Sequence, residues 1–381
     1  MNLRFLAHRV PFPPDRGDKI RSFHALRYLA ARARVHLYAF ADDPADEWPA
    51  PELRALTASC TIVPRRKGRA RATLEALASG RPVSLTAFDD PAMRAAVAAA
   101  PACEATYCFS GQMAQYLTDQ GREVMDFVDV DSAKFAQLAT TAPLPLRPLY
   151  AREARLLGRF ERAVAGRVAA SLFVTAAEAA LFGGGTVVEN GIDPRHFDPA
   201  AVAPVRTEGP LIVFTGQMDY PPNIEAVRWF AARVLPGVRA RVPAARFAIV
   251  GRAPTPAVRA LAGEAVIVTG AVPDTRPWLA AAAVCVAPLS LARGVQNKVL
   301  EAMAMARPIV ASPGAAEGID HGGTIAVADG AGDWVERVCA AIAAGRNDAA
   351  RAQVLARYDW DARLQPLDAL LGLAAPDRAA A

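Results

Sequence analysis

The sequence predicts an α/β protein made of two doubly wound, Rossmann-like domains that face a cleft, and three observations lead to this fold class. The chain has 381 residues, more than one hydrophobic core usually organises. Hydrophobic residues make up 53% of it and charged residues 21%, which is typical of a globular protein. Strand-like apolar runs alternate with helical patterns along the chain, as in parallel sheets that helices cover on both faces.

The first domain is expected over residues 1–190. Its strands are short apolar runs rich in β-branched and aromatic residues, predicted at Leu3–Ala7, Val35–Phe40, Cys60–Val63, Ala105–Phe109, Glu123–Val128, Ala170–Val174 and Val187–Glu189. Helical patterns between these runs predict helices at Lys19–Ala31, Pro91–Ala99 and Tyr150–Ala165.

A linker is expected over residues 191–210, because a turn signal at residues 190–194 is followed by three prolines without periodicity. The second domain is expected over residues 211–356, with strands at Leu211–Thr215, Phe247–Val250, Val266–Thr269, Val284–Ala287, Pro308–Ala311 and Ile325–Val327. Its helices are predicted at Asn223–Leu235, Thr275–Ala281, Asn297–Ala306 and Asp333–Ala343. Residues 357–381 are expected to hold a C-terminal helix, kinked at Pro366, that packs back toward the first domain.

Composition and missing motifs exclude several classes of protein. The net charge of +5 is small, whereas nucleic-acid-binding chains carry a stronger basic stripe. Five cysteines form no CxxC pair, which is typical of reduced, buried thiols. The N-terminus is too short and polar for a signal peptide, and the longest uncharged run, Pro277 to Ala292, is too short to span a membrane. We therefore expect a cytoplasmic protein.

The absence of P-loop, GxGxxG and nucleophile-elbow motifs argues against an NTPase, a dehydrogenase and an α/β-hydrolase.

The most informative stretch is residues 293–312, which follow an apolar strand, open a helix and end in a second strand. Gly294 permits close backbone approach, and the free N–H groups near Asn297, with the helix dipole, favour a phosphate there. Lys298 and Glu301 are three residues apart and share one helix face, where a carboxylate can accept two hydrogen bonds from a ribose diol. Spacing alone leaves open an ordinary surface Lys–Glu pair.

Residues 301–304 (Glu-Ala-Met-Ala) and 308–312 (Pro-Ile-Val-Ala-Ser) resemble the donor-site signature of glycosyltransferase family 4, the retaining GT-B enzymes. Residues 190–193 resemble its domain-joining motif, and Gly270-x-Val272 with Val284-x-Val286-x-Pro288 resembles its nucleoside-side strands. The resemblance implies that Glu301 holds the nucleotide ribose. It also implies a retaining transferase that needs no metal and no cofactor, whose substrate is a nucleotide sugar and whose leaving phosphate helps to deprotonate the incoming hydroxyl.

Three further stretches are similar to a narrower group, the sugar transferases found with exosortase/PEP-CTERM exopolysaccharide systems. These are residues 11–22 (PFPPDRGDKIRS), 126–132 (DFVDVDS) and 214–223 (FTGQMDYPPN). This similarity implies a role in exopolysaccharide biosynthesis, with a glycan or a lipid-linked glycan as acceptor.

The chain departs from the family pattern where donor phosphates are usually contacted. The first of the family's two glutamates is replaced by Arg293, and its usual Arg and Lys after the first strand of the second domain are replaced by Gln217 and Pro222. We predict that Arg293 and Lys298 together replace this cationic pair, because arginine grips two phosphate oxygens and lysine supplies a point charge. The alternative is that Arg293 points to solvent and only Lys298 matters.

The predicted site residues form three groups. The catalytic candidates are Arg293, Lys298 and Glu301. The residues expected to bind the donor are Gly17, Gly216, Gly251, Arg252, Val272, Gly294, Val295, Gln296 and Asn297. The residues expected on the acceptor side are Arg16, Asp18, Lys19, Asp129 and Asp131. The last two lie near the place where the family often has a histidine.

Some acidic residues have a second interpretation. Asp18 is also a candidate N-cap of the helix after the first strand. Asp126, Asp129 and Asp131 also suggest a metal site. We favour no metal there, because alternation along a strand places Asp126 on the opposite side from the other two.

Basic residues predict loose attachment to an anionic inner membrane through the first domain. Four arginines recur at helical spacing, namely Arg152, Arg155, Arg159 and Arg162, and residues 65–71 add a second cluster. The alternative is a solvated helix whose arginines are partly paired with Glu153 and Glu161.

Other functions stay open. A GT-B sugar-nucleotide epimerase would use the same fold with water as acceptor. A non-catalytic partner of a polysaccharide assembly complex is suggested by the family residues missing at positions 217, 222 and 293. A two-lobed extracytoplasmic binding protein is disfavoured by the missing signal peptide.

Overall fold

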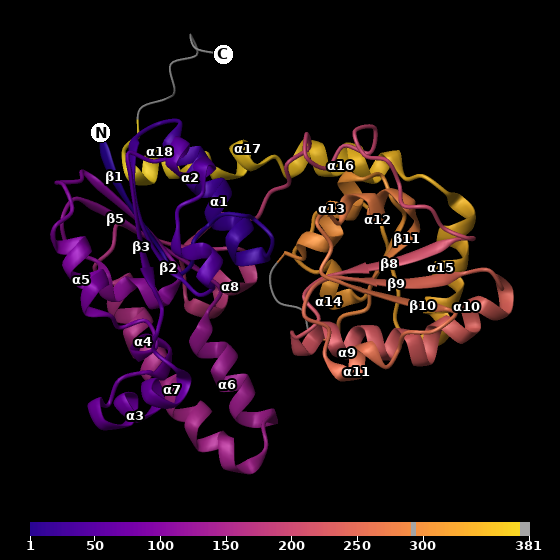
Figure 1. Cartoon of the computed structure of the whole chain (residues 1–381), viewed down its shortest axis with the longest axis horizontal. Coiled ribbons are helices and arrows are strands. Elements are labelled where there is room, and N and C mark those ends of the chain that lie inside the picture. Colours follow the sequence, from indigo (N-terminus) through magenta and orange to yellow (C-terminus); the bar gives the residue numbers. More distant parts are fainter. Residues whose placement is uncertain (291–294, 374–381) are drawn as a thin grey trace, which may run out of the picture. The chain divides into compact units, whose positions relative to one another are not determined.

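The structure, a computed structural model, describes residues 1–290 and 295–373. The chain divides into two compact units. Unit 1 comprises Met1–Glu189 and the segment that begins at Leu364, and unit 2 comprises Asn190–Arg363. Each unit is a parallel sheet with helices packed around it (Figure 1). Two parallel-sheet α/β units confirm the predicted fold class.

In the described part of unit 1, seven parallel strands form one sheet in the order β3-β2-β1-β4-β5-β6-β7. They are β1 (Asn2–Ala7), β2 (Arg34–Ala41), β3 (Ser59–Pro64), β4 (Ala105–Phe109), β5 (Arg122–Val128), β6 (Ala170–Phe173) and β7 (Thr186–Val187). Parallel strands covered on both faces are continuous apolar runs, which is why the sequence located them well. The order reverses between β1 and β4, so the loops after them open at the edge where such sheets bind ligands.

The helices of unit 1 are less visible in the sequence. They are α1 (Gly17–Ala30), η1 (Pro44–Glu47), α2 (Pro51–Leu56), α3 (Arg69–Ser79), α4 (Val83–Thr86), α5 (Pro91–Ala98), η2 (Gly111–Tyr116), α6 (Asp131–Thr141), η3 (Leu144–Leu146), α7 (Arg147–Ala165), α8 (Ala176–Phe182) and α18 (Pro366–Leu371). Helix α18 buries Leu367 and Leu371, and its Asp368 pairs with Arg32 at 3.1 Å.

In the described part of unit 2, six parallel strands form a sheet in the order β10-β9-β8-β11-β12-β13. They are β8 (Leu211–Thr215), β9 (Arg246–Val250), β10 (Val266–Gly270), β11 (Ala282–Ala287), β12 (Ile309–Ala311) and β13 (Ala326–Val327). The order reverses between β8 and β11, which places the loops after these two strands at the ligand-binding edge.

The helices around this sheet follow the predicted pattern with two breaks. They are α9 (Pro221–Trp229), η4 (Phe230–Val234), α10 (Leu235–Arg241), α11 (Pro256–Arg259), α12 (Arg276–Ala281), α13 (Asn297–Ala304), α14 (Pro313–Ala316), α15 (Ala331–Ala344), α16 (Asp348–Arg357) and α17 (Trp360–Leu364). The helix predicted at Asn223–Leu235 contains the π-helical turn η4, since Pro236 has no N–H for a normal helical bond. The predicted C-terminal helix is split into α17 and α18 at Pro366.

None of the described helices is both long and apolar enough to span a membrane.

Candidate functional site

Two glycines shape the ends of strands β8 and β9 in unit 2. A Cβ atom on Gly251 would lie 1.7 Å from the carbonyl oxygen of Gly216. A Cβ atom on Gly216 would lie 2.8 Å from the side-chain nitrogen Nδ2 of Asn223. Only glycine therefore lets these two loops pass so closely. The Gly216 N–H donates to the Val250 carbonyl at 3.0 Å, and the Met218 N–H donates to the Arg252 carbonyl at 2.9 Å. Both predicted glycines thus have a structural reason to be there.

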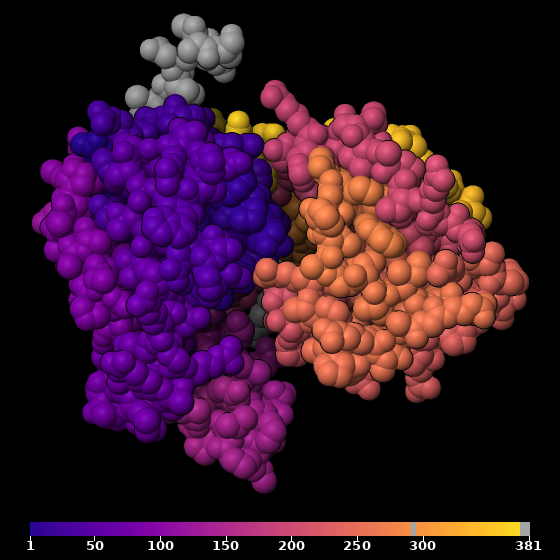
Figure 2. Space-filling view, viewed as in Figure 1, coloured from indigo at the N-terminus to yellow at the C-terminus, as the bar shows by residue number. Residues whose placement is uncertain are grey.

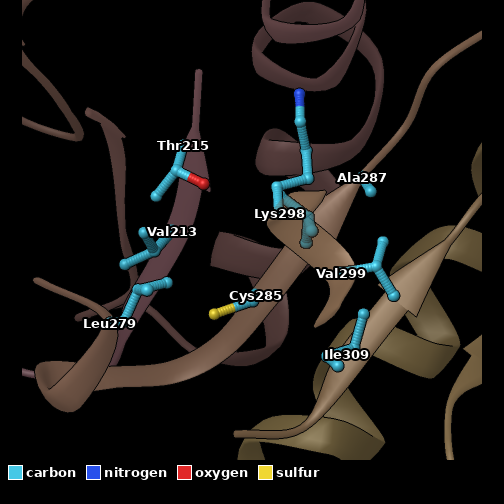
Figure 3. Close-up of a pocket in the computed structure, with 9 residues that line it drawn as sticks. Val213, Thr215, Leu279, Cys285, Ala287, Lys298, Val299 and Ile309 are labelled. Atoms are coloured by element: carbon cyan, nitrogen blue, oxygen red, sulfur yellow. The ribbon is translucent and has the colours of Figure 1, made fainter. Parts of the chain in front are cut away.

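Lys298 lies in the first turn of α13, beside these glycines. Its Nζ donates to Oδ1 of Asn223 at 2.8 Å and lies 4.0 Å from the centre of the Phe214 ring. Figure 3 shows its ammonium group extending beyond Thr215 and Ala287, at the ends of β8 and β11. Burial lowers the pKa of Lys298 to about 7, although the charge of Glu301 acts in the opposite direction. Among the described residues no carboxylate forms an ion pair with this amine.

A small hollow of about 10 Å³ lies beneath Lys298, lined by Val213, Thr215, Leu279, Cys285 and Ile309 among others (Figure 3). It is barely large enough for one water molecule, so it does not hold a substrate. Burial also raises the pKa of the Cys285 thiol to about 12, which makes this cysteine inert. The group in this region that can contact a ligand is therefore the Lys298 ammonium, which lies above the hollow.

Glu301 follows Lys298 by one helical turn and is half-buried. Burial raises the pKa of its carboxyl group to about 7, and the positive charge of Lys298 partly offsets this. No described residue donates a hydrogen bond to this carboxylate or forms an ion pair with it. Lys298 and Glu301 are therefore two half-buried groups of opposite charge that both lack an ionic partner in this part of the chain. Such groups are poised to receive a polar ligand.

The start of α13 adds backbone donors to this pair. Gln296 occupies the N-cap without a side-chain cap, so N–H groups of the first turn remain available. The Asn297 side chain is held by the Asn190 amide, which donates to its Oδ1 at 3.2 Å. Val295 is buried in the core of unit 2 and anchors the helix rather than contacting a ligand.

The remaining predicted donor residues are placed as follows. Arg252 donates to Oε1 of Gln217 at 3.4 Å, on the same loops as the two glycines. Val272 lies after β10 and packs against the core of unit 2. Gly17 is the first residue of α1 in unit 1. Arg293 and Gly294 lie outside the described residues.

Asn223 and Phe214, which contact Lys298, had no predicted role, although both lie in the stretch 214–223.

The predicted acceptor residues at the start of α1 are held in ion pairs. Arg16, not Asp18, is at the N-cap position, and the predicted cap is therefore wrong. Asp18 instead faces Arg9, with which it forms an ion pair, and His8, whose Nε2 lies 3.2 Å from its Oδ2. Burial acts to raise the pKa of Asp18, but His8 and Arg9 outweigh it and hold the pKa well below its usual range. Lys19 is buried and pairs with Asp46 at 2.9 Å.

The acidic residues after β5 have two different environments. Asp126 is fully buried, where it pairs with Nε of Arg21 at 2.8 Å and accepts a hydrogen bond from the Tyr107 hydroxyl. Asp126 is therefore structural. Asp131 accepts from Nε2 of Gln112 at 3.1 Å. Among the described residues, no group of three or more His, Cys, Asp or Glu side chains is arranged to hold a metal ion.

Asp129 follows a strained turn. Val128 has a φ of 70°, which is costly for a β-branched residue, and the Asp129 N–H donates back to the Phe127 carbonyl at 2.9 Å. Burial raises the pKa of Asp129 to about 6, and the nearby carboxylates of Glu178 and Asp131 add to the effect. Its Oδ1 atom is buried without a hydrogen-bond partner in the described part of the chain.

Comparisons with known proteins agree with this description. Residues 209–344, which run from just before β8 to the end of α15, match the family model described as glycosyl transferases group 1. Among curated protein sequences, none matches the chain.

Solved structures resemble the chain over nearly its full length. Anabaena HepE, solved with UDP and glucose, has a TM-score of 0.66 at 15% identity and covers 98% of this chain and 99% of its own. WaaG, described as a glycosyltransferase involved in lipopolysaccharide biosynthesis, has a TM-score of 0.65 at 14% identity, covering 97% and 100%. A glycosyltransferase from Rickettsia africae has a TM-score of 0.59 at 11% identity, covering 97% and 98%. These similarities confirm the predicted GT-B fold.

Proposed function

We propose that this chain is a glycosyltransferase that moves a sugar from a nucleotide-sugar donor to a hydroxyl group of a glycan or glycolipid acceptor. The observation that carries the proposal is the pair Lys298 and Glu301, half-buried, one turn apart and without ionic partners among the described residues, at the start of α13. The family match over residues 209–344 includes this pair. Solved structures of HepE with UDP and with UDP-glucose support a uridine nucleotide as the first donor to test.

Each residue of the pair suits one part of such a donor. The Glu301 carboxylate accepts hydrogen bonds from the two ribose hydroxyls. The Lys298 ammonium, positioned by Asn223, neutralises the diphosphate, and the free N–H groups of α13 donate to the same phosphates. A Cβ atom on Gly216 would lie 3.3 Å from the Lys298 ammonium, so the glycine leaves room for this cation beside the backbone. We keep Arg293 as the second cation of this clamp, as its position in the sequence predicts.

We propose further that the transfer proceeds with retention and without a resident metal or cofactor. The bond between the anomeric carbon and the diphosphate oxygen breaks, and the acceptor oxygen forms its bond on the same face of the sugar. The acceptor proton passes to the leaving phosphate. The positive charges that stabilise this phosphate come from the protein, as in other sites that rely on preorganised donors. Transfer should then continue at an unchanged rate after treatment with EDTA.

On the acceptor side we propose four residues in the segments that follow β1 and β5, namely Arg16, Asp18, Asp129 and Asp131. Asp129 has the strongest support, because its half-buried carboxyl has an unusual pKa and stands on a strained turn. Lys19 supports this region through its buried pair with Asp46. The similarity to exopolysaccharide transferases makes a growing glycan, carried on a lipid at the inner membrane, the acceptor that we propose.

The test is turnover of nucleotide sugars by the purified chain. A panel of UDP-, GDP- and ADP-sugars is incubated with the chain and a bacterial glycolipid extract, and products are identified by mass spectrometry and by the NMR signal of the anomeric proton. We expect nucleotide release that requires Lys298 and Glu301, together with a new glycoside of retained configuration. A sugar-nucleotide isomer formed without acceptor would identify an epimerase instead. Binding of the nucleotide without any turnover would identify a non-catalytic partner.

A further inference from the structure

Helix α3 of unit 1 exposes its two leucines and buries only two of its alanines. Leu74 and Leu77 are 69% and 55% exposed, whereas Ala72 and Ala76 on the opposite face are fully buried. An amphipathic helix normally places its largest apolar side chains toward the core. The exposed face of α3 is therefore apolar without an apolar neighbour to cover it in the described structure.

A second pair of leucines is exposed at the turn between α6 and α7. Leu144 and Leu146 of η3 are 74% and 42% exposed. Helix α6, which leads to this turn, has no buried residue. The two helices therefore form a hairpin that stands out from unit 1, as Figures 1 and 2 show (α6 and α7 in magenta).

The two pairs of leucines belong to one end of unit 1. Nη2 of Arg152 in α7 donates to the Ala76 carbonyl of α3 at 2.7 Å, which ties the two helices together. Leu146 precedes Arg152 by six residues, a rise of roughly 9 Å along a helix. Figure 1 shows α3 beside α7 at the same end of the unit. We call Leu74, Leu77, Leu144 and Leu146 the leucine surface.

Arg66 and Arg69 lie beside the leucine surface, whereas three more arginines lie farther along α7, roughly 14 to 24 Å from Leu146 along the helix. Arg66 and Arg69 flank the start of α3 and form no ion pair with a described residue. The same holds for Arg155, Arg159 and Arg162, which share the exposed face of α7 and line a hollow of about 530 Å³ beside α6 and α8.

The acidic residues of α7 do not neutralise these arginines. Glu153 accepts from the Ser84 N–H at 2.8 Å and Glu161 accepts from the Ser132 N–H at 3.0 Å, so both hold the starts of other helices. The alternative of arginines partly paired with these glutamates is therefore not seen as ion pairs in the described part of the chain, although the charge of Arg162 acts to lower the pKa of Glu161. Only Arg152 is turned inward.

We propose that unit 1 docks on an anionic lipid bilayer through the leucine surface, whose side chains enter the interface while Arg66 and Arg69 beside it bind lipid phosphates. Protruding leucines among unpaired cations are the chemistry of an interfacial anchor, since apolar insertion and attraction to anionic headgroups add together. This inference goes beyond the proposed function, because docking does not depend on turnover. Helices α3 and α6, which lead to this surface, both begin after the carboxyl ends of strands, β3 and β5, where such sheets bind ligands.

The experiment is co-sedimentation of the full chain with vesicles of phosphatidylcholine, with and without phosphatidylglycerol. We expect binding to the anionic vesicles only, reversed by high salt. Replacement of all four leucines of the surface by Gln should reduce the bound fraction by roughly tenfold. Arg66→Glu with Arg69→Glu should do the same. The matched controls lie in unit 2, namely Tyr220→Gln, a 51% exposed aromatic residue, and the exposed Arg241→Glu, both of which should bind like wild type.

Because all the replaced side chains are exposed, thermal unfolding of the variants should match that of wild type. Three results would overturn the proposal. The first is that wild type fails to bind anionic vesicles at low salt. The second is that the four-leucine variant binds vesicles as well as wild type does, which would mean that charge alone attracts the protein to the lipid. The third is that no protein sediments with the vesicles, while light scattering shows a concentration-dependent dimer that the leucine replacements abolish. This result would assign the surface to contact with a second copy of the chain.

Discussion

The pKa values of Lys298 and Glu301 are both brought to about 7 by the same cause, burial, through shifts in opposite directions. Burial favours the neutral form of each group, so it lowers the pKa of Lys298 to about 7 and raises the pKa of Glu301 to about 7. In the proposed function the active forms are the charged ones, the ammonium for the diphosphate and the carboxylate for the ribose. Nucleotide binding therefore has to stabilise the two charges that folding makes costly.

This predicts opposite pH dependences for the two parts of the nucleotide. Uridine affinity should strengthen as the pH rises through 7, because Glu301 loses its proton. The additional affinity that UDP has over uridine should weaken as the pH rises through 7, because Lys298 loses its proton. Titration calorimetry on both sides of pH 7 measures both, and Lys298→Gln and Glu301→Gln serve as controls that each remove one dependence. Parallel slopes for the two ligands would contradict the assignment.

Glu301→Ala should weaken donor binding or turnover by roughly tenfold or more, since a ribose left without its buried partner costs about 1–3 kcal/mol. The protein should not unfold. In wild type the raised pKa of Glu301 makes the native state lose stability as the pH rises from the unfolded value near 4.5 to about 7. Glu301→Gln should therefore unfold at a higher temperature than wild type above pH 7, while its activity is lost. Wild-type turnover in either variant would refute the role of Glu301.

The cationic clamp can be tested by removing each charge. Lys298→Ala and Arg293→Ala should each weaken UDP binding by roughly tenfold and leave uridine binding nearly unchanged, because charge-assisted hydrogen bonds to phosphate are lost. Calorimetry with the two ligands gives both values. If Arg293→Ala binds UDP as tightly as wild type does, Lys298 acts without a second cation.

Among the elements, the strands were predictable and several helices were not. Strands buried on both faces are apolar runs with clear ends, and the predicted Ala105–Phe109 and Leu211–Thr215 agree with β4 and β8 residue by residue. Helices α3 and α6 were missed, because α6 buries no residue and α3 buries only alanines, so neither has a regular apolar stripe toward a core.

The placement of Lys298 and Glu301 side by side was predictable because both lie on one helix, whereas their neighbours were not. Lys298 and Glu301 are three residues apart in sequence, so helical spacing alone places them together. Asn223 contacts Lys298 from the start of α9, 75 residues earlier in the sequence. A local sequence pattern cannot predict a contact between residues so far apart. The strained φ of Val128 is equally invisible in the sequence, since valine in that conformation is unfavourable in isolation.

The close approach of the loops after β8 and β9 predicts that a side chain added at Gly251 is costly. Gly251→Ala should lower stability by about 3 kcal/mol and abolish nucleotide binding, because the added Cβ would meet the Gly216 carbonyl at 1.7 Å. Gly263→Ala is the matched control, with no atom within 4 Å of the added Cβ. Thermal unfolding and calorimetry of both variants measure the difference. A Gly251→Ala protein as stable as the control would mean that the loops can separate at little cost.

For the whole molecule, each unit contributes a different kind of surface. Unit 2 contributes a compact polar site at the carboxyl edge of its sheet, where strand ends, helix N–H groups and the pair on α13 meet. Unit 1 contributes strained and charged turns at the corresponding edge of its own sheet, together with the leucine surface. This division suits an enzyme that takes a soluble nucleotide sugar and an acceptor held at a membrane.

The most direct test of this account is calorimetric titration of nucleoside diphosphates into wild type and into the double variant Lys298→Gln, Glu301→Gln. Glu301→Gln keeps the size of the side chain and Lys298→Gln shortens it by one bond. Both remove a charge that burial makes costly, so the variant should fold and unfold at a temperature no lower than that of wild type. The account predicts that a nucleoside diphosphate, UDP first, binds wild type and that the double variant loses roughly a hundredfold or more of this affinity. It is contradicted if no nucleoside diphosphate binds wild type, or if the folded double variant binds UDP as tightly as wild type does.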